Sequence, residues 1–338
     1  MRRRIPGNRG SSALLALIAT AVTAAAISAS CSGPSHSDRA AELLPTTPTQ
    51  QPSRVLTAVT FSPRSSLARL ELRSGNVHQL AVGDFFAVAH PSLSPSGQLA
   101  FIGSRCASCQ QRLTVLQGRR VATLAQALSA TWMNSRRLVV SVGRGEDTDI
   151  WVVGLNGRGH ELKWLTGAAG RMGIETEKEL VVSPNRRMLL FSGEGSAEHH
   201  GNYIVDLLRR RLLPLAGEAA DAPTFSPDGR TIAYQQVSRG GDWDLCLSGV
   251  SRRAAAHPHC LRSPGNDREP AFRPSGRKIV FASDRASRRN GVSSLYLLDL
   301  RTGSVRRLTP AGYDAISPTL APDGRSVIFV RRALVPLR

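Results

Sequence analysis

Lysine, aromatic residues and long apolar runs are all scarce in this sequence. The basic side chains are almost all arginine, because the lysines are only Lys163, Lys178 and Lys278. Aromatic residues make up 5% of the 338 residues, so a core must rest on the aliphatic side chains that dominate the 41% hydrophobic content. After the first 30 residues, no run is long and apolar enough to cross a membrane.

Motifs for catalysis are also missing. The sequence contains no Gly-x-Ser-x-Gly nucleophile elbow, and the repeats described below leave no residues for a hydrolase domain, so we predict no peptidase and no enzyme. Two groups of potential metal ligands are more typical of solvated loops than of metal sites, and four acidic residues are more typical of strand-end turns than of a catalytic pair. We therefore predict no catalytic residue, no cofactor and no metal site. The groups are Glu194, Glu198, His199 and His200; His257, His259 and Cys260; and Asp147, Asp149, Asp242 and Asp244.

The first 30 residues are typical of a signal peptide. A basic segment is followed by an apolar run from Ala13 to Ile27, which is too short for a comfortable membrane span. Small residues then precede Cys31, as in a bacterial lipobox, although Ser28 stands where leucine is usual. We expect Cys31 to be lipidated; ordinary cleavage and an uncleaved anchor remain alternatives.

Residues 31–53 predict a disordered linker, and residues 54–338 the folded domain. The linker is rich in Ser, Pro, Thr and Gln and cannot bury enough apolar surface to fold. The remaining four cysteines are an even number in a compartment that permits disulfides. We predict Cys106–Cys109 as a small bridge that locks a loop rather than a redox centre, and Cys246–Cys260 as a bridge across a hairpin.

The formal charge of +19 favours polyanionic partners such as acidic wall polymer or anionic lipid heads. Arginine pairs recur throughout the chain, and we expect most of them to be solvent-exposed residues at turns and strand edges, spread around the rim of the domain. A GC-rich genome would explain the arginine bias equally well. No nucleic-acid motif accompanies these pairs, so we predict no nucleic-acid partner.

An internal repeat determines the expected fold. The segment APTFSPDGRTIAY, from Ala222 to Tyr234, has relatives that begin at His90, Glu269 and Ser317, with two degenerate copies that end at Val140 and Phe191. The copies recur every 40 to 50 residues, which is the period of a four-stranded propeller blade. Each predicts a tight turn, in which proline presets φ and glycine supplies a positive φ. The turn residues are Pro95, Gly97, Pro227, Asp228, Gly229, Pro274, Gly276, Pro322, Asp323 and Gly324.

A second hairpin follows each of the first kind, as from Ser294 to Thr309 and from Asp149 to Thr166. Six pairs of hairpins predict an all-β fold, a six-bladed β-propeller with four-stranded blades. The chain enters with a second-type hairpin and leaves with a first-type one, so N- and C-terminal strands should share a blade and close the ring. The apolar run Val55–Phe61 is one strand more than this count requires.

These repeats resemble the WD-like propeller of the TolB family, most clearly from Pro223 to Tyr234 and from Pro270 to Thr309. The resemblance implies a protein-binding module of the cell envelope. No room is left for the separate N-terminal domain of TolB itself, so an exported lipoprotein with a TolB-like propeller is the better match.

The function predicted from sequence is a membrane-tethered, extracytoplasmic scaffold that binds envelope proteins. We expect it to be exported and anchored to the outer face of the cell membrane, or secreted, and to be monomeric. The alternative is an extracellular propeller enzyme, a lactonase or glycan-active protein, that uses the central channel.

Overall fold

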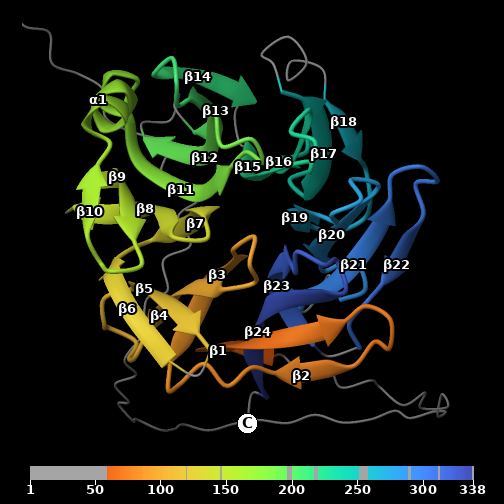
Figure 1. Cartoon of the computed structure of the whole chain (residues 1–338). Helices are drawn as coiled ribbons and strands as arrows, with labels where there is room; N and C mark the ends of the chain where they lie inside the picture. Colours follow the sequence, from red (N-terminus) through yellow and green to blue (C-terminus); the bar gives the residue numbers. More distant parts are fainter. Residues whose placement is uncertain are drawn as a thin grey trace, which may run out of the picture. The chain divides into compact units, whose positions relative to one another are not determined.

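The computed structural model describes residues 59–118, 120–144, 147–195, 200–216, 220–250, 258–287, 291–310 and 313–336. The signal-peptide and linker predictions, Cys31 included, lie outside these ranges. Within the compact unit Val55–Arg338, six four-stranded antiparallel sheets form the blades of a propeller (Figure 1). The predicted fold class is confirmed.

Five blades are each built from consecutive strands, numbered here from the innermost strand outward. Blade 1 contains β3 (Ala87–Leu93), β4 (Leu99–Ser104), β5 (Arg112–Gln117) and β6 (Arg120–Gln126). Blade 2 contains β7 (Ser129–Asn134), β8 (Arg137–Arg144), β9 (Asp147–Gly154) and β10 (Gly159–Glu161). Blade 3 contains β11 (Ile174–Val182), β12 (Met188–Gly195), β13 (Gly201–Asp206) and β14 (Arg211–Ala216). Blade 4 contains β15 (Ala220–Phe225), β16 (Thr231–Val237), β17 (Trp243–Gly249) and β18 (His259–Leu261). Blade 5 contains β19 (Asp267–Phe272), β20 (Lys278–Ser283), β21 (Ser294–Asp299) and β22 (Val305–Arg307).

Blade 6 joins the two ends of the described chain, as the repeat order predicts. Its strands are β23 (Asp314–Leu320), β24 (Ser326–Pro336), β1 (Val59–Glu71) and β2 (Val77–Gln79), in that order from the inside. Of the run Val55–Phe61 that the sequence left unplaced, residues 59–61 form the start of β1. After an irregularity between Phe61 and Ser65, its backbone continues the pairing with β24 as far as Val59 opposite Pro336. The β1–β24 strand pair that closes the ring is thus longer than one blade requires.

A repeated aromatic position anchors each blade to its neighbours. The second strand carries Phe101, Phe191, Tyr234, Phe281 or Phe329 at equivalent repeat positions, and each of these side chains is completely buried. Blade 2 has the smaller Val140 there. Burying a side chain of this size stabilises the fold by about 2–3 kcal/mol. The scarcity of aromatic residues is therefore compensated by their placement between blades.

The repeat turns form as the sequence suggests. Gly97, Gly229, Gly276 and Gly324 have φ values of +81°, +69°, +69° and +66°. Each donates its N–H to the carbonyl three residues earlier, at 2.8–2.9 Å. Such φ values favour glycine, and proline precedes each glycine by two residues at the position where its fixed φ suits the turn.

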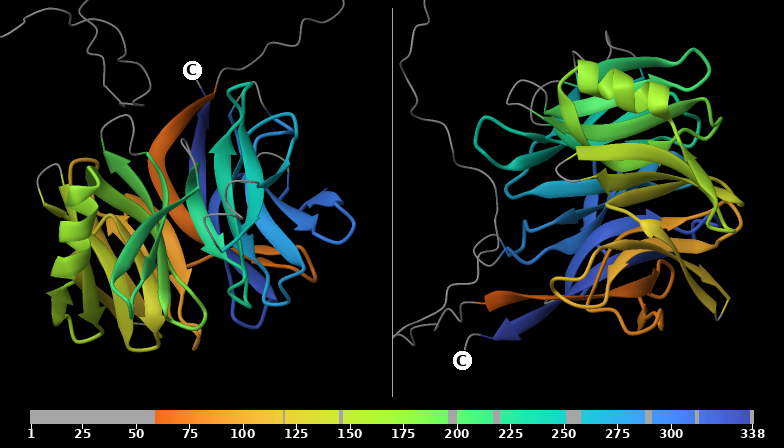
Figure 2. Two further views of the ribbon diagram at one scale, coloured as in Figure 1. Left: turned by 90° about the horizontal axis from the view of Figure 1, so that it is seen from above. Right: turned by 90° about the vertical axis from the view of Figure 1, so that its left-hand side faces the viewer.

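Antiparallel pairing sorts the connections onto two opposite ends of the ring, seen edge-on in Figure 2. Turns between strands 1 and 2, and between strands 3 and 4, lie at one end, which we call the turn end. Loops between strands 2 and 3, and the links between blades, lie at the other, which we call the loop end. Because β1 starts and β24 finishes at the loop end, the described chain enters and leaves there (Figure 2).

One predicted hairpin ends earlier than expected. After β10, residues Lys163–Arg171 form the helix α1 instead of completing the hairpin to Thr166. Leu165-Thr166 has the same sequence as Leu308-Thr309, which follows the last strand of blade 5. In blade 2, however, Leu165 and Ala169 are the buried residues of a helix. The four-residue spacing of these apolar side chains fits a helix, and packing beside blade 3 stabilises it.

Candidate binding site

The innermost strands of five blades share a β-bulge that aims one side chain at the central channel. The ladder between strands 1 and 2 shifts register at this point in each of them. The residue at the bulge has a positive φ of 47–52° although it is not glycine, and in four cases a proline follows it. Proline suits such a position because the bulge requires no N–H there. The bulge residues are His90, Glu179, Ala222, Glu269 and Ser317.

These bulges line a central cavity of about 190 Å³, to which every blade contributes three consecutive residues. The segments are 90–92, 129–131, 179–181, 222–224, 269–271 and 317–319. Sequence reasoning did not pick out these residues. The available signal was the residue before the proline in each repeat, which is charged or polar in His90, Glu269 and Ser317.

An ion pair crosses this channel. His90 Nδ1 of blade 1 lies 3.3 Å from Glu179 Oε1 of blade 3, and their side chains are 30% and 27% exposed. The Glu179 carboxylate raises the pKa of His90 to about 9. Burial raises the pKa of Glu179, but the charge of His90, its hydrogen bond and the charge of Lys178 together outweigh burial, and the net direction is downward. The pair is therefore charged at neutral pH.

Glu269 and Ser317 of the channel belong to a chain of hydrogen bonds that extends to Gln235 and Asp221. The backbone N–H and hydroxyl of Ser317 both donate to the Glu269 carboxylate. The Gln235 amide accepts from the Glu269 N–H at 2.9 Å and donates to Asp221 at 3.4 Å. Burial raises the pKa of both Glu269 and Asp221. These partners fix the channel wall. The cavity of about 190 Å³ is small for a ligand site, since ligand pockets are usually about 300–1,000 Å³.

The loop end is braced by two buried aspartates that each hold an arginine. Asp267, with no exposed side-chain surface, accepts from Arg285 at 2.7 Å, and the Arg285 guanidinium lies over the rings of Phe281 and Tyr296 at 5.3 and 5.0 Å. Asp314, equally buried, pairs with Arg332 at 2.6 Å. These contacts fix the links into blades 5 and 6 against the strands beneath.

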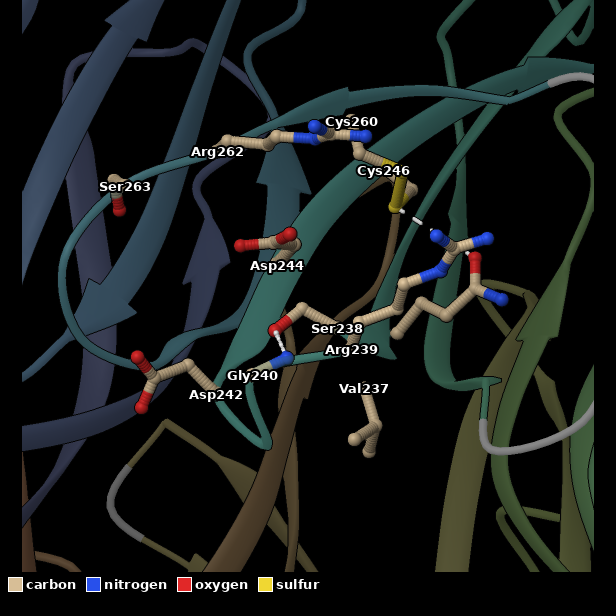
Figure 3. Close-up of a pocket in the computed structure, with 11 residues that line it drawn as sticks. Val237, Ser238, Arg239, Gly240, Asp242, Asp244, Cys246, Cys260, Arg262 and Ser263 are labelled. Atoms are coloured by element: carbon tan, nitrogen blue, oxygen red, sulfur yellow. Dashed lines mark hydrogen bonds between the residues drawn. A yellow bond between two sulfur atoms is a disulfide. The ribbon is translucent and has the colours of Figure 1, made fainter.

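A pocket of about 530 Å³ opens at the loop end of blade 4 (Figure 3). Its wall combines the β16–β17 loop with the link to blade 5. The Cys246–Cys260 disulfide lies on one side, and the charged side chains of Asp242, Asp244 and Arg262 lie around it. Val237, 37% exposed, adds an apolar surface. The pocket is therefore rigid, mixed in charge and partly apolar.

Both predicted disulfides are present. Cys246 and Cys260 are direct partners in the β17–β18 ladder, with Cα atoms 4.0 Å apart. Cys106–Cys109 closes the loop between β4 and β5, with Cα atoms 5.0 Å apart, at the loop end of blade 1. The prediction that these bridges serve structure is consistent with their places in the fold.

The structure describes only some of the residues weighed as metal ligands. Glu194 pairs with Lys178 and lies 4.0 Å from His200, while Glu198, His199 and His257 lie outside the described residues. Across the part of the chain that the structure describes, no group of three or more His, Cys, Asp or Glu side chains is arranged to hold a metal ion. No helix in the same ranges is long and apolar enough to span a bilayer.

With this geometry in hand, the chain belongs to the class of six-bladed β-propellers closed by a shared blade. Residues 203–335 match the family model described as the TolB beta propeller domain. The chain is thus a TolB-like propeller, as its repeats imply. The solved structure of a putative TolB from Agrobacterium tumefaciens superimposes with a TM-score of 0.63 at 19% identity, covering 80% of this chain and 99% of that one.

Sequence relatives match over short stretches. A TolB homolog of Chlorobium chlorochromatii is 32% identical over 108 residues, which is 32% of this chain and 22% of that protein. An uncharacterized peptidase of Bacillus subtilis is 26% identical over 109 residues, 31% of this chain and 16% of that protein. A gluconolactonase from Xanthomonas campestris shares the fold at 14% identity, with a TM-score of 0.55 over 83% of this chain and 99% of that one. These propellers differ in function, so the shared fold alone does not assign one.

Proposed function

We propose that this protein is an exported, membrane-tethered propeller scaffold that binds a protein of the cell envelope through its loop end. The observation that carries the proposal is the braced loop end of blades 4 to 6. Arg285–Asp267 fixes the link beside the pocket of blade 4, and Arg332–Asp314 fixes the link into blade 6, before any partner arrives. A surface fixed in advance loses little conformational entropy on binding.

The composition of this surface also fits a protein partner. Protein interfaces combine an apolar centre with a polar rim. Val237 supplies an exposed apolar side chain in the pocket, and Arg239 and Arg262 flank it. The tethering part of the proposal comes from Cys31 and the basic and apolar segments before it.

Crosslinking in native envelopes tests the scaffold function. We expect wild-type chain to capture one defined protein, and Arg239→Glu with Arg262→Glu to lose at least about tenfold of that capture, as happens when charges at an interface are reversed. Arg158→Glu with Arg301→Glu at the turn end is the matched control and should retain it. Equal capture by wild type and both double variants would reject the loop end as the binding surface.

Cys31→Ala should release the protein from the membrane, and mass spectrometry of the mature N-terminus reports the lipid directly.

An enzyme that uses the channel is the second candidate, because the half-buried Glu269 and the His90–Glu179 pair supply acid–base groups in one cavity. Lactone hydrolysis by wild type that His90→Gln abolishes would favour it. The enzyme hypothesis is the weaker candidate, because the channel cavity is small and the Glu269 carboxylate already accepts hydrogen bonds from Ser317.

A further inference from the structure

The turn end carries five arginines, which we call the arginine ring, each just after the turn between strands 1 and 2. The residue that follows the turn is Arg137, Arg187, Arg230, Arg277 and Arg325 in blades 2 to 6, and all five side chains are exposed. The turns of blades 1 and 2 are one residue shorter, so Gln98 and Arg137 occupy the position of Thr231 rather than that of Arg230. The sequence predicts that the arginine pairs, which include Arg137 and Arg187, are solvated rims spread around the ring, but antiparallel pairing brings these two and the three single arginines to the same end.

The turns of blades 3 to 6 touch their neighbours, so their four arginines lie in a row at the turn end. A methyl group on Gly229, Gly276 or Gly324 would lie 3.8, 3.6 or 3.1 Å from a proline of the preceding blade's turn. The Arg273 guanidinium donates to the Gly324 carbonyl at 2.7 Å, which also joins neighbouring turns. Backbone hydrogen bonds to turn side chains fix four of the ring positions directly, as in Arg230 N–H to Asp228 at 3.0 Å and Arg325 N–H to Asp323 at 2.9 Å.

Further basic side chains surround this ring, and few acids balance them. The turn-end acids in the described ranges are Glu71, Asp206, Asp228, Asp299 and Asp323. Most of them accept hydrogen bonds from their own turns, and two pair with Arg209 and Lys278. None of the five ring arginines takes part in an ion pair within these ranges. The additional basic residues are Arg73, Arg136, Arg158, Arg186, Arg209, Arg210, Arg211, Arg273, Lys278, Arg301, Arg306 and Arg307.

Blade 2 adds a groove without a carboxylate. This recess of about 470 Å³ is lined by Arg136, Arg137, Arg158 and His160, together with backbone and small side chains of the β9–β10 turn. A groove with several cations and no acid suits a segment of an anionic chain. The loop end has the opposite charge balance, because most of the described acidic residues lie there or in the channel. A polyanion would therefore be directed to the turn end alone.

We propose that the turn end, formed by the arginine ring and the blade 2 groove, binds a linear polymer of phosphate groups. Arginine is suited to this chemistry because its planar guanidinium can bind two phosphate oxygens at once. A membrane surface or a protein fits less well, since both usually require apolar anchors. Leu208 is the single large hydrophobic side chain that the described turn end exposes strongly. This surface is separate from the loop-end partner site, and neither proposal depends on the other.

The test uses the full chain with Cys31→Ala, so that a lipid cannot mediate binding. Linear inorganic polyphosphate is the polymer probe, and vesicles of phosphatidylglycerol with phosphatidylcholine are the membrane probe. The ring variant replaces the exposed Arg137, Arg187, Arg230, Arg277 and Arg325 with glutamine, which removes the charge and keeps a polar side chain. The control variant removes the same charge by replacing exposed loop-end arginines with glutamine: Arg105, Arg112, Arg171, Arg239 and Arg262.

We expect the ring variant to bind polyphosphate at least about 100-fold more weakly than wild type, and the control variant within about fivefold of it. The slope of log affinity against log salt concentration should fall by about four in the ring variant, because each arginine–phosphate contact releases roughly one counterion. Circular dichroism and thermal unfolding confirm that both variants are folded. Equal losses in both variants, no polyphosphate binding by wild type, or binding to the vesicles alone would each overturn the proposal. Capture of the envelope partner by the ring variant should remain unchanged, which separates this test from the scaffold function.

Discussion

The ion pair across the channel predicts a specific dependence of stability on pH. His90 has its pKa raised from 6.5 to about 9 by Glu179, so folding favours its protonated form. The stabilisation is complete below pH 6.5, the value in the unfolded chain, and is lost as the pH rises through 9. Glu179 acts in the opposite sense: its lowered pKa gives stability that is lost as the pH falls below about 4.5. The pair should therefore stabilise most between about pH 5 and 6.5.

The magnitude follows from the shift and the exposure. If the pair were fully shielded from solvent, the rise in the pKa of His90 from 6.5 to about 9 would correspond to about 3.4 kcal/mol of folding free energy, at 1.36 kcal/mol per pKa unit. Both side chains keep contact with the channel, at 30% and 27% exposure, so solvent screening reduces the expected coupling to about 1–2 kcal/mol.

A double-mutant cycle isolates this coupling. His90→Gln, Glu179→Gln and the double variant are unfolded in urea at pH 6, 7.5, 9 and 10, and the coupling energy is calculated at each pH. Because Glu269 and Asp221 are present in all four proteins, their contributions largely cancel. We expect about 1–2 kcal/mol at pH 6 and a value near zero at pH 10. A coupling energy that stays constant across this range, or grows with pH, would refute the assignment of a charged pair.

Two further predictions concern the stability of the ring. Removing the Cys246–Cys260 bridge by double alanine substitution should cost about 3 kcal/mol of unfolding free energy, the chain-entropy value for a loop of about 15 residues. Peptide mapping without reductant should recover the pair linked, and alkylation of both thiols in the native exported protein would contradict the bridge. Gly324→Ala should lower stability by about 1 kcal/mol more than Gly303→Ala. Both glycines have φ near +67°, but only at Gly324 would the methyl group press against Pro274, at 3.1 Å. Equal losses in urea unfolding would show that contact between neighbouring turns contributes nothing.

The propeller could be predicted because its repeat is both periodic and local. The turn of Ser226-Pro227-Asp228-Gly229 depends on residues adjacent in sequence, and six copies at one spacing determine the number of blades. The Cys246–Cys260 pair was equally accessible, since a hairpin places its opposite residues together. Helix α1 was missed because Leu165-Thr166 fits the repeat pattern locally, and only packing beside blade 3 decides between hairpin and helix.

The channel cluster could not be derived from pattern alone. His90 and Glu179 come from blades 1 and 3, so their contact depends on ring closure and on bulges that reverse the direction of single side chains. A shift of one residue in a strand moves a side chain to the other face, and periodicity does not reveal where that shift occurs. The loop-end brace between Asp267 and Arg285 is similar, because it joins the start of β19 to the loop after β20.

The two ends of the propeller are under different physical constraints, and this explains why they suit different partners. The turns between strands 1 and 2 are short, and in blades 1, 4, 5 and 6 they are fixed by proline and glycine, so the backbones of neighbouring blades differ there by at most one residue. Recognition at that end must come from side chains on a nearly uniform frame, and a repeated arginine gives repeated charge, which suits a repeating polymer. Loops at the loop end differ in length and in how they are braced, so they can form one irregular pocket that suits a single folded partner. Since β1 also begins at the loop end, a chain tethered through its N-terminal segment would leave the arginine ring on the face opposite its point of entry.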